Sequence, residues 1–299
     1  MFDRSQNITL IAIHGEFPIG VWMLMSIRFS DRLGSLDEKT GEFLRTLGYM
    51  GGYCTVDQAR RLDLANSPTR VLERLKRLED HRFLRRVLAY PLVYQVTKSV
   101  TRMLGTDLMA RRVHPMETVR WRLLAVNFYL EARTWPADFI LDHGERVSAL
   151  QRIGCPPDAL PHRRGRPYLW QVFILDLHDG GLCVSVVDRP DCSAFLQALG
   201  FVERFAECRQ SVGEQLSLVI AVNSDARRRL YSKAVIHAKV REHAHGAAEP
   251  VSVYRVSLPV PSIHATNHEP DTHTDNFIRG GHERHETDRH NSAVLGSQG

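Results

Sequence analysis

The chain has 299 residues, 43% of them hydrophobic, and a formal net charge of +5. That apolar content is enough for one or two folded domains, which excludes a chain too polar to build a core. Lys and Arg together number 39 against 34 Asp and Glu, a modest excess that favours an anionic partner without identifying one.

Residues 1–36 are predicted to be an extension that precedes the folded part. The stretch NITLIAIHGEFPIGVWMLMSIRF is apolar on average, but Glu16 and Pro18 interrupt it and no basic segment or cleavage site frames it. We therefore expect a cytoplasmic protein that does not contact a membrane. Because Met23 and Met25 precede an ordinary start, one interpretation is that residues 1–24 are an upstream addition with no role in the fold.

Three helix signals follow one another in the next fifty residues. EKTGEFLRTLGYMG places its large apolar residues on one face and ends at two glycines. In GYCTVDQARRL, Thr55 and Gln58 have the spacing of a capping box. After the loop DLANS, Ser67 is a good N-cap residue and Pro68 fits the first position of a third helix.

The third predicted helix separates apolar and basic side chains onto two faces. At about 100° per residue, one side is expected to carry Val71, Leu72, Leu75 and Leu78, and the basic side Arg70, Arg74, Arg77 and His81. In an isolated helix a charged outer face usually serves solubility alone. The neighbouring elements make a binding role worth considering here.

After this helix, FLRRVLAYPLVYQVT alternates well enough for two strands connected near Pro91, and residues 97–104 resume helical character. Three helices followed by a two-stranded wing is the order of the winged helix-turn-helix, in which the third helix lies in the DNA major groove. We assign this fold to residues 37–112.

The winged helix predicts which side chains contact duplex DNA. Arg and Lys attract phosphates, and Arg also donates paired hydrogen bonds to a guanine edge. The predicted DNA-binding residues are Thr69, Arg70, Arg74, Lys76 and Arg77 on the third helix, with Arg85, Arg86 and Tyr90 on the wing. A winged helix can also dock proteins, and that alternative predicts no salt-sensitive affinity for DNA.

Residues 113–258 are predicted to form a second, α/β domain. A helix over 117–131 is followed by the strand WPADFIL, the helix GERVSALQRIG and a hairpin around HDGG. The helix SAFLQALGFVERFAECRQ, the strand LSLVIAV, the helix SDARRRLYSKAVIHAKV and the strand VSVYRVSL complete a layered order. The basic loop HRRGR at 162–166 is interpreted either as a solvated loop or as an added phosphate contact.

Residues 259–299 are predicted to be a disordered tail, because they hold too few large apolar residues to offset the entropy of ordering. Its histidines are His264, His268, His273, His282, His285 and His290. Their spacing fits no fixed set of metal ligands, so we expect no metal or other cofactor.

The five cysteines are odd in number and show no CxxC spacing, which predicts free thiols in a reducing compartment and no zinc site. The sequence also contains no GxxxxGK[ST], GxGxxG after a strand, GxSxG or HExxH motif. Nucleotide-binding, hydrolase and zincin functions are therefore not indicated.

Several of these segments together resemble one protein family. They are GYCTVDQARRL with SPTRVLERLKRLEDHRFLRRV, the Tyr94 and Thr97 of VYQVT, VRWRLLAVNFYLEA, Pro157-Asp158-Ala159, and Val187-Asp188-Arg189. Over roughly residues 38–225 the chain is similar to the replication-relaxation or MobC-like proteins of plasmids and integrative elements. The resemblance implies a second domain similar to the PD-(D/E)xK nuclease fold, and a DNA-binding accessory factor of plasmid replication or conjugal mobilisation.

A metal-dependent nuclease of that fold needs carboxylates to hold Mg²⁺ and commonly a lysine near the attacking water. Asp158, Asp176 and Asp188 are the candidate ligands if the domain cuts DNA. No lysine occurs between Lys98 and Lys233, so we expect a degenerate domain without catalytic residues. A divergent Mg²⁺-dependent nuclease targeted by the winged helix is the alternative.

The sequence thus predicts an α+β protein that binds double-stranded DNA as a regulator or accessory factor, with the nuclease as the alternative. We expect a homodimer, because DNA sites of winged-helix proteins are commonly palindromic. The resemblance adds a relaxase or a replication protein as a partner.

Overall fold

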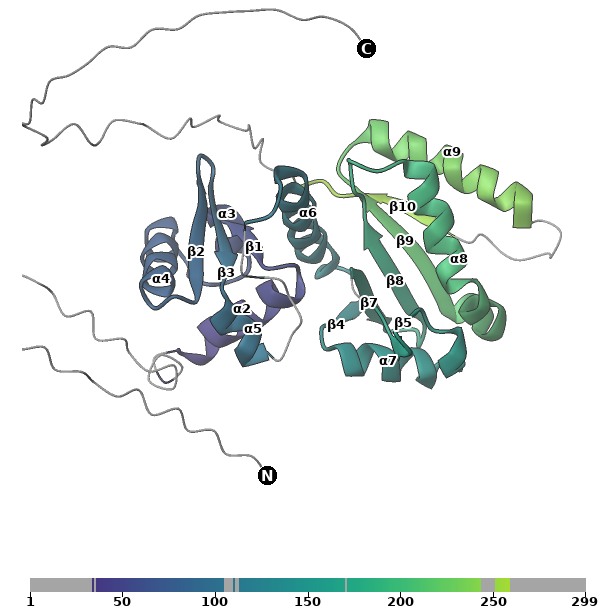
Figure 1. Ribbon diagram of the computed structural model, residues 1–299, viewed down its shortest axis with the longest axis horizontal. Helices are drawn as coiled ribbons and strands as arrows, with labels where there is room; N and C mark the ends of the chain where they lie inside the picture. Colours follow the sequence, from purple (N-terminus) through teal and green to yellow (C-terminus); the bar gives the residue numbers. More distant parts are fainter. Residues whose placement is uncertain are drawn as a thin grey trace, which may run out of the picture. The chain divides into compact units, whose positions relative to one another are not determined.

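The computed structural model describes residue 34 and residues 36–104, 110, 113–169, 171–242 and 251–258 (Figure 1). These residues form helices and three separate sheets, which confirms the predicted α+β class. The predictions for residues 1–33 and for the tail from residue 259 lie outside the described residues. Within the described ranges, no helix combines the length and apolar character that crossing a membrane requires.

Residues 36–104 form a unit that we call the N-terminal module. Its elements are α2 (Glu38–Tyr49), β1 (Tyr53–Thr55), α3 (Val56–Arg61), α4 (Pro68–Asp80), β2 (Leu84–Ala89), β3 (Leu92–Val96) and α5 (Lys98–Leu104). All the helices and the hairpin predicted here are present. The sequence did not predict β1, which pairs antiparallel with β3 and gives the strand order β1-β3-β2.

Side-chain caps explain where the helices of this module begin. The Thr55 hydroxyl accepts a hydrogen bond from the Gln58 backbone, and the Gln58 side chain accepts one from the Thr55 N–H, so the predicted capping box is present. Ser67 Oγ accepts from the backbone N–H of Arg70 at 3.3 Å. The first helix has a cap that the sequence analysis did not name, Asp37.

Residues 116–258 contain a mixed five-stranded sheet in the order β10-β9-β8-β7-β4. The elements are α6 (Met116–Ala132), β4 (Ala137–Ile140), α7 (His143–Arg152), η1 (Pro157–Ala159), β5 (His162–Arg163), β6 (Arg166–Pro167), β7 (Val172–Leu177), β8 (Leu182–Val187), α8 (Ala194–Val212), η2 (Gly213–Gln215), β9 (Leu216–Val222), α9 (Asp225–Glu242) and β10 (Ser252–Arg255). Strands β4, β7 and β8 are antiparallel, whereas β8, β9 and β10 are parallel. Every helix and strand predicted for this region is present.

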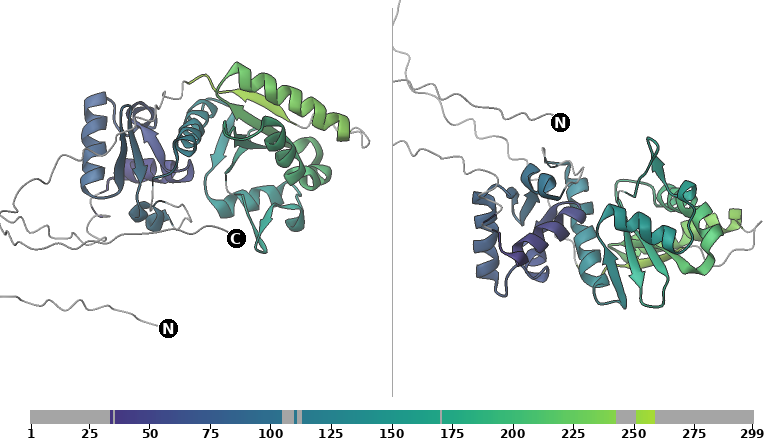
Figure 2. Two further views of the ribbon diagram at one scale, coloured as in Figure 1. Left: turned by 45° about the horizontal axis from the view of Figure 1, so that its top comes forward. Right: turned by 90° about the horizontal axis from the view of Figure 1, so that it is seen from below.

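Alternating side chains of the sheet build two cores. Val172 and Ile174 of β7 pack with residues of α7, α8 and α9 on one face. Phe173 and Leu175 point to the other face, where α6 lies. Figures 1 and 2 both show α6 between the sheet and the N-terminal module. A helix buried on both sides is expected to be apolar around most of its circumference, as α6 is.

Hydrogen bonds tie α6 to the N-terminal module. The buried amide of Gln58 donates to the Leu123 carbonyl at 2.8 Å and to Asn127 Oδ1 at 2.7 Å. The Arg122 guanidinium donates to the Gly51 carbonyl at 2.9 Å. Gly51 has a φ of +101°, and a Cβ there would lie 2.9 Å from Arg122 Cγ, so this turn requires glycine.

The other side of α6 is bound to the sheet. Trp121 Nε1 donates to the carbonyl of Val187 at the end of β8, at 3.1 Å. The Phe128 ring is fully buried and contacts the rings of Phe173 and Tyr254 at centroid distances of 6.2 and 6.3 Å. One helix therefore supplies core residues to both parts of the chain.

Cys155 and Cys208 form a disulfide that joins the segment before η1 to α8, with their Cα atoms 5.0 Å apart. The prediction of five free thiols is wrong for this pair. The two cysteines are separated by 53 positions in the sequence, and only the packing of η1 against α8 brings them together. Cys54, Cys183 and Cys192 are free.

Candidate nucleic-acid interface

Helix α4 has one buried face, formed by Val71, Leu75 and Leu78. Leu72 was expected on that face but is 40% exposed, so its assignment was wrong. The reason is its phase: Leu72 lies about 90° around the helix from the centre of the buried residues, at about 100° per residue. The buried stripe is narrower than the sequence suggested, and more of α4 faces outward.

Most of the predicted contact residues of α4 lie on this outward surface. Thr69, Arg70, Lys76 and Arg77 are all exposed. Among the described residues, the side chains of Arg70, Lys76 and Arg77 form neither an ion pair nor a hydrogen bond. Three cationic groups on one helix are thus available to a partner.

Arg74 has a different environment from its neighbours on α4. Its guanidinium donates to the Leu64 carbonyl at 2.9 Å and lies 3.4 Å from the Asp37 carboxylate. The pKa of Asp37 is lowered, mainly by hydrogen bonds from Thr40, with further contributions from the charges of Arg74 and Arg77. The structure therefore gives Arg74 a role in joining α4 to the preceding loop and to the start of α2.

The arginines of the β2–β3 hairpin are also engaged. Arg85 donates to Gln95 Oε1 at 2.9 Å and to the Ala110 carbonyl at 3.2 Å. Arg86 forms an ion pair with Glu79 of α4 at 3.1 Å, which braces the hairpin against the helix. These contacts hold the guanidinium groups along the strand and restrict what else they can bind.

The tip of this hairpin carries no charge. Residues 87–93 read VLAYPLV, and Tyr90 beside Pro91 is 91% exposed. The sequence analysis placed Tyr90 against a DNA backbone. The local chemistry supplies an aromatic ring and apolar side chains, which suit stacking or insertion better than a contact with phosphate alone.

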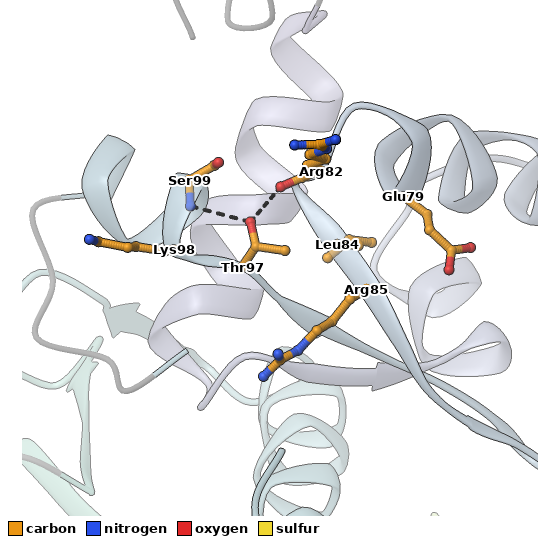
Figure 3. A pocket seen from close by; sticks show the side chains of 7 residues that line it. All are labelled: Glu79, Arg82, Leu84, Arg85, Thr97, Lys98 and Ser99. Atoms are coloured by element: carbon orange, nitrogen blue, oxygen red, sulfur yellow. Dashed lines mark hydrogen bonds between the residues drawn. The ribbon is translucent and has the colours of Figure 1, made fainter. Parts of the chain in front are cut away.

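A hollow of about 490 Å³ lies at the base of the hairpin, where α4 ends and α5 begins (Figure 3). Its lining residues are Glu79, Arg82, Leu84, Arg85, Thr97, Lys98 and Ser99. The Thr97 hydroxyl donates to the Arg82 carbonyl at 2.5 Å and accepts from the Ser99 N–H at 3.2 Å. These bonds fix the start of α5 against the turn that follows α4.

The sequence analysis did not select Arg82 and Lys98. Arg82 has a φ of +59° in the turn after α4, and Lys98 opens α5, so both positions depend on turns that the pattern does not reveal. Figure 3 shows the charged ends of Arg82, Arg85 and Lys98 pointing apart. They extend the positive surface of the module but do not converge on one anion.

The three carboxylates considered for a nuclease do not form one site. Asp158 is exposed in η1, and Asp176 forms an ion pair with Arg152 at 2.6 Å. Asp176 pairs with Leu182 at one end of β8, whereas Asp188 follows the other end of that strand. Within the residues that the structure describes, no group of three or more His, Cys, Asp or Glu side chains could hold a metal ion.

Asp188 is fully buried and bound by protein groups on both oxygens. Arg227 donates to Oδ1 and Oδ2 at 2.6 and 2.9 Å, and the Tyr231 hydroxyl donates to Oδ1 at 2.8 Å. Burial raises the pKa of Tyr231, and the charge of Asp188 raises it further. This network fastens α9 to the end of β8, a structural use of Asp188 that its position in the sequence did not indicate.

Comparisons with known proteins found nothing similar to this chain: no family model, no curated protein and no solved structure matches it. The resemblance to replication-relaxation or MobC-like proteins stays a prediction.

Proposed function

We propose that this chain binds duplex DNA through a winged helix, with α4 in the major groove, and that it serves as a regulatory or accessory protein of a mobile genetic element. The observation that carries the proposal is the outer face of α4. There Arg70, Lys76 and Arg77 are exposed, and among the described residues their side chains form neither an ion pair nor a hydrogen bond.

The arrangement around α4 supports this proposal. A short helix, α3, precedes it, and the antiparallel hairpin β2–β3 follows it, which is the order in which a winged helix presents its recognition helix and wing. Arg70 lies in the first turn of α4, the part of a recognition helix that contacts base edges in this class of protein. We assign direct base contacts to Arg70 and Thr69.

The remaining contacts follow from the same geometry. Arg77, Lys76 and Arg82 supply charge for phosphates, and each neutralised phosphate releases a bound counterion. Arg85 and Arg86 stabilise the wing and contribute to its positive potential, while Tyr90 contacts the minor groove at the wing tip. Arg74 supports α4 from behind.

We treat the five-stranded sheet as a non-catalytic domain related to the PD-(D/E)xK fold that the resemblance implies. The engagement of Asp188 by Arg227 and Tyr231 supports a structural use of this carboxylate. No observation favours the Mg²⁺-dependent nuclease over this proposal. The link to plasmid replication or mobilisation and the relaxase or replication partner rest on the resemblance. The homodimer rests on the symmetry of DNA sites, and the cytoplasmic location on the interruption of the N-terminal apolar stretch by Glu16 and Pro18.

The proposal is tested by selecting binding sequences from a pool of random duplexes and comparing three proteins on the selected site. Wild type is expected to prefer that site over unrelated DNA. The double substitution Arg70→Gln/Arg77→Gln is expected to remove most of the preference, because a paired Arg–guanine contact is worth about 1–3 kcal/mol.

The matched control is Arg228→Gln/Arg229→Gln, which removes two exposed arginines from α9 and leaves the N-terminal module unchanged. It is expected to keep the preference. If folded wild type enriches no sequence, or if the α4 and α9 variants bind alike, α4 is not the recognition helix.

A further inference from the structure

We propose that the β5–β6 hairpin is a second DNA-binding element, an arginine-tipped finger that contacts phosphates of the duplex beside the segment bound by α4. This inference rests on the proposed DNA binding and extends it to the part of the chain that carries the sheet. With this second contact, the length of DNA that the protein protects is expected to exceed that protected by a single winged helix.

The hairpin is a compact projection with a fixed base. His162 pairs with Pro167 and Arg163 with Arg166, so only Arg164 and Gly165 remain in the turn. The segment enters and leaves through Leu160 and Leu169, both buried in the core of the sheet. A short turn on an anchored base has little backbone freedom to lose on binding.

The tip of the hairpin is strongly and uniformly basic. Residues 160–169 contain Arg163, Arg164 and Arg166 and no acidic residue. All three arginines are exposed, and among the described residues neither Arg164 nor Arg166 has an ion pair. Charges of one sign that are not compensated locally attract an anionic surface more strongly than interspersed charges do.

Arg163 is held in place by the residue that closes the finger. Its guanidinium donates to the Tyr168 hydroxyl at 3.1 Å and lies 5.1 Å from the centre of that ring. The contact leaves the guanidinium exposed and sets its direction. Tyr168 is therefore a positioning residue for the Arg163 charge.

The backbone of the turn is unfavourable for arginine. Arg164 and Gly165 have φ values of +54° and +74°, and two successive positive values favour Asn, Asp or Gly at the first position. A positive φ is uncommon for a residue other than glycine, so the conformation of this turn does not by itself account for an arginine. The proposed phosphate contact gives its exposed charge a role.

A series of contacts through α2 connects the base of the finger to α4. The base carbonyl of Pro167 is 3.2 Å from His143 Nε2, and the adjacent Asp142 accepts from the Tyr49 hydroxyl at the end of α2, at 3.3 Å. At the beginning of α2, Asp37 contacts Arg74 of α4.

Helix α2 is the longest link in this series: its 12 residues are about 18 Å long, which is about five base pairs at about 3.4 Å each. The proposal therefore requires a duplex that extends beyond the segment bound by α4 by more than about five base pairs.

The test uses the full chain and the double variant Arg164→Asn/Arg166→Gln on a duplex that wild type binds. Asn followed by Gly suits this turn, so the variant is expected to fold at least as well as wild type. Affinity is measured across a salt series, and contacts are mapped by hydroxyl-radical footprinting. The control is again Arg228→Gln/Arg229→Gln.

We expect the finger variant to bind three- to thirty-fold more weakly and to lose about 1.8 from the slope of log affinity against log salt, about 0.9 per phosphate. Its footprint should shorten at one edge while sequence preference stays the same. If wild type binds and the α4 variant loses preference, but the finger variant keeps the wild-type slope and footprint, the finger is not a contact and the proposed function still holds. Absence of DNA binding by wild type would overturn both.

Discussion

Two arginines one turn apart on α4 differ in their side-chain contacts. Arg74 donates a hydrogen bond to the Leu64 carbonyl and forms an ion pair with Asp37. The side chain of Arg70 forms neither kind of contact in the described part of the chain. Because a lost hydrogen bond to a part-buried group costs about 1–2 kcal/mol, Arg74→Ala is expected to lower the free energy of unfolding by that amount. Arg70→Ala is expected to change it by less than about 0.5 kcal/mol.

Urea denaturation followed by circular dichroism separates the two variants. If α4 binds DNA as proposed, DNA affinity should show the reverse ranking, since Arg70→Ala removes a proposed contact with the duplex and is expected to leave the fold intact. Equal losses of stability in both variants would show that Arg70 has a structural partner and would remove it from the interface.

At the residue scale, the sequence predicted local features better than distant ones. The capping residues Thr55 and Ser67 were predictable because each cap bonds to a backbone group within three positions. The pairing of Asp188 with Arg227 was not, because the two residues are 39 positions apart and meet only when α9 packs on β8. The same limit applied to Arg74, whose partners belong to another helix and a loop.

Predictions of single helices and strands were likewise better where the signal was local than where it depended on distant residues. Hairpins and helices with clear periodicity were predicted in the right order, including the turn at residues 178–181. Strand β1 was missed because three residues carry no detectable pattern and its partner, β3, lies about 40 residues further along the chain. The β5–β6 finger was predicted as a loop because its strands have only two residues each.

The disulfide is an element-scale link whose effect can be measured. It closes a loop across 53 positions, and a disulfide of this kind stabilises by about 2–4 kcal/mol. Reduction with dithiothreitol is therefore expected to lower the urea midpoint of wild type. The Cys155→Ser/Cys208→Ser variant should match the reduced protein and show no response to dithiothreitol.

A wild-type midpoint that does not respond to dithiothreitol, together with two titratable thiols at these positions in native protein, would contradict the link. Cys192 is the suitable control, because it is free and only partly buried. Cys192→Ser is expected to leave the response to reduction unchanged.

At the scale of the whole molecule, α6 determines whether the N-terminal module and the five-stranded sheet unfold together. Its residues belong to the core of the N-terminal module and to that of the sheet, so the two parts are expected to unfold together. Leu123 is fully buried against the module, and Leu123→Ala is expected to lower the free energy of unfolding by about 2–5 kcal/mol. The matched control is Leu230→Ala at an exposed position of α9, which is expected to lower it by less than about 0.5 kcal/mol.

Hydrogen exchange read by mass spectrometry shows whether the two parts are coupled. In the Leu123→Ala variant, peptides that cover α3 and β9 should lose protection in parallel. Faster exchange in α3 with unchanged exchange in β9 would mean that the N-terminal module unfolds by itself and that α6 stays with the sheet.

The most direct test of the proposed function is a fluorescence-anisotropy titration of duplex DNA across a salt series, with wild type beside Arg70→Gln/Arg77→Gln. The affinity of wild type is predicted to fall steeply as salt rises, because each phosphate contact contributes about −0.9 to the slope of log affinity against log salt. The variant is predicted to bind more weakly and with a shallower slope. Folded wild type that does not bind at low salt, or an affinity that neither salt nor the substitutions change, would contradict DNA binding by α4.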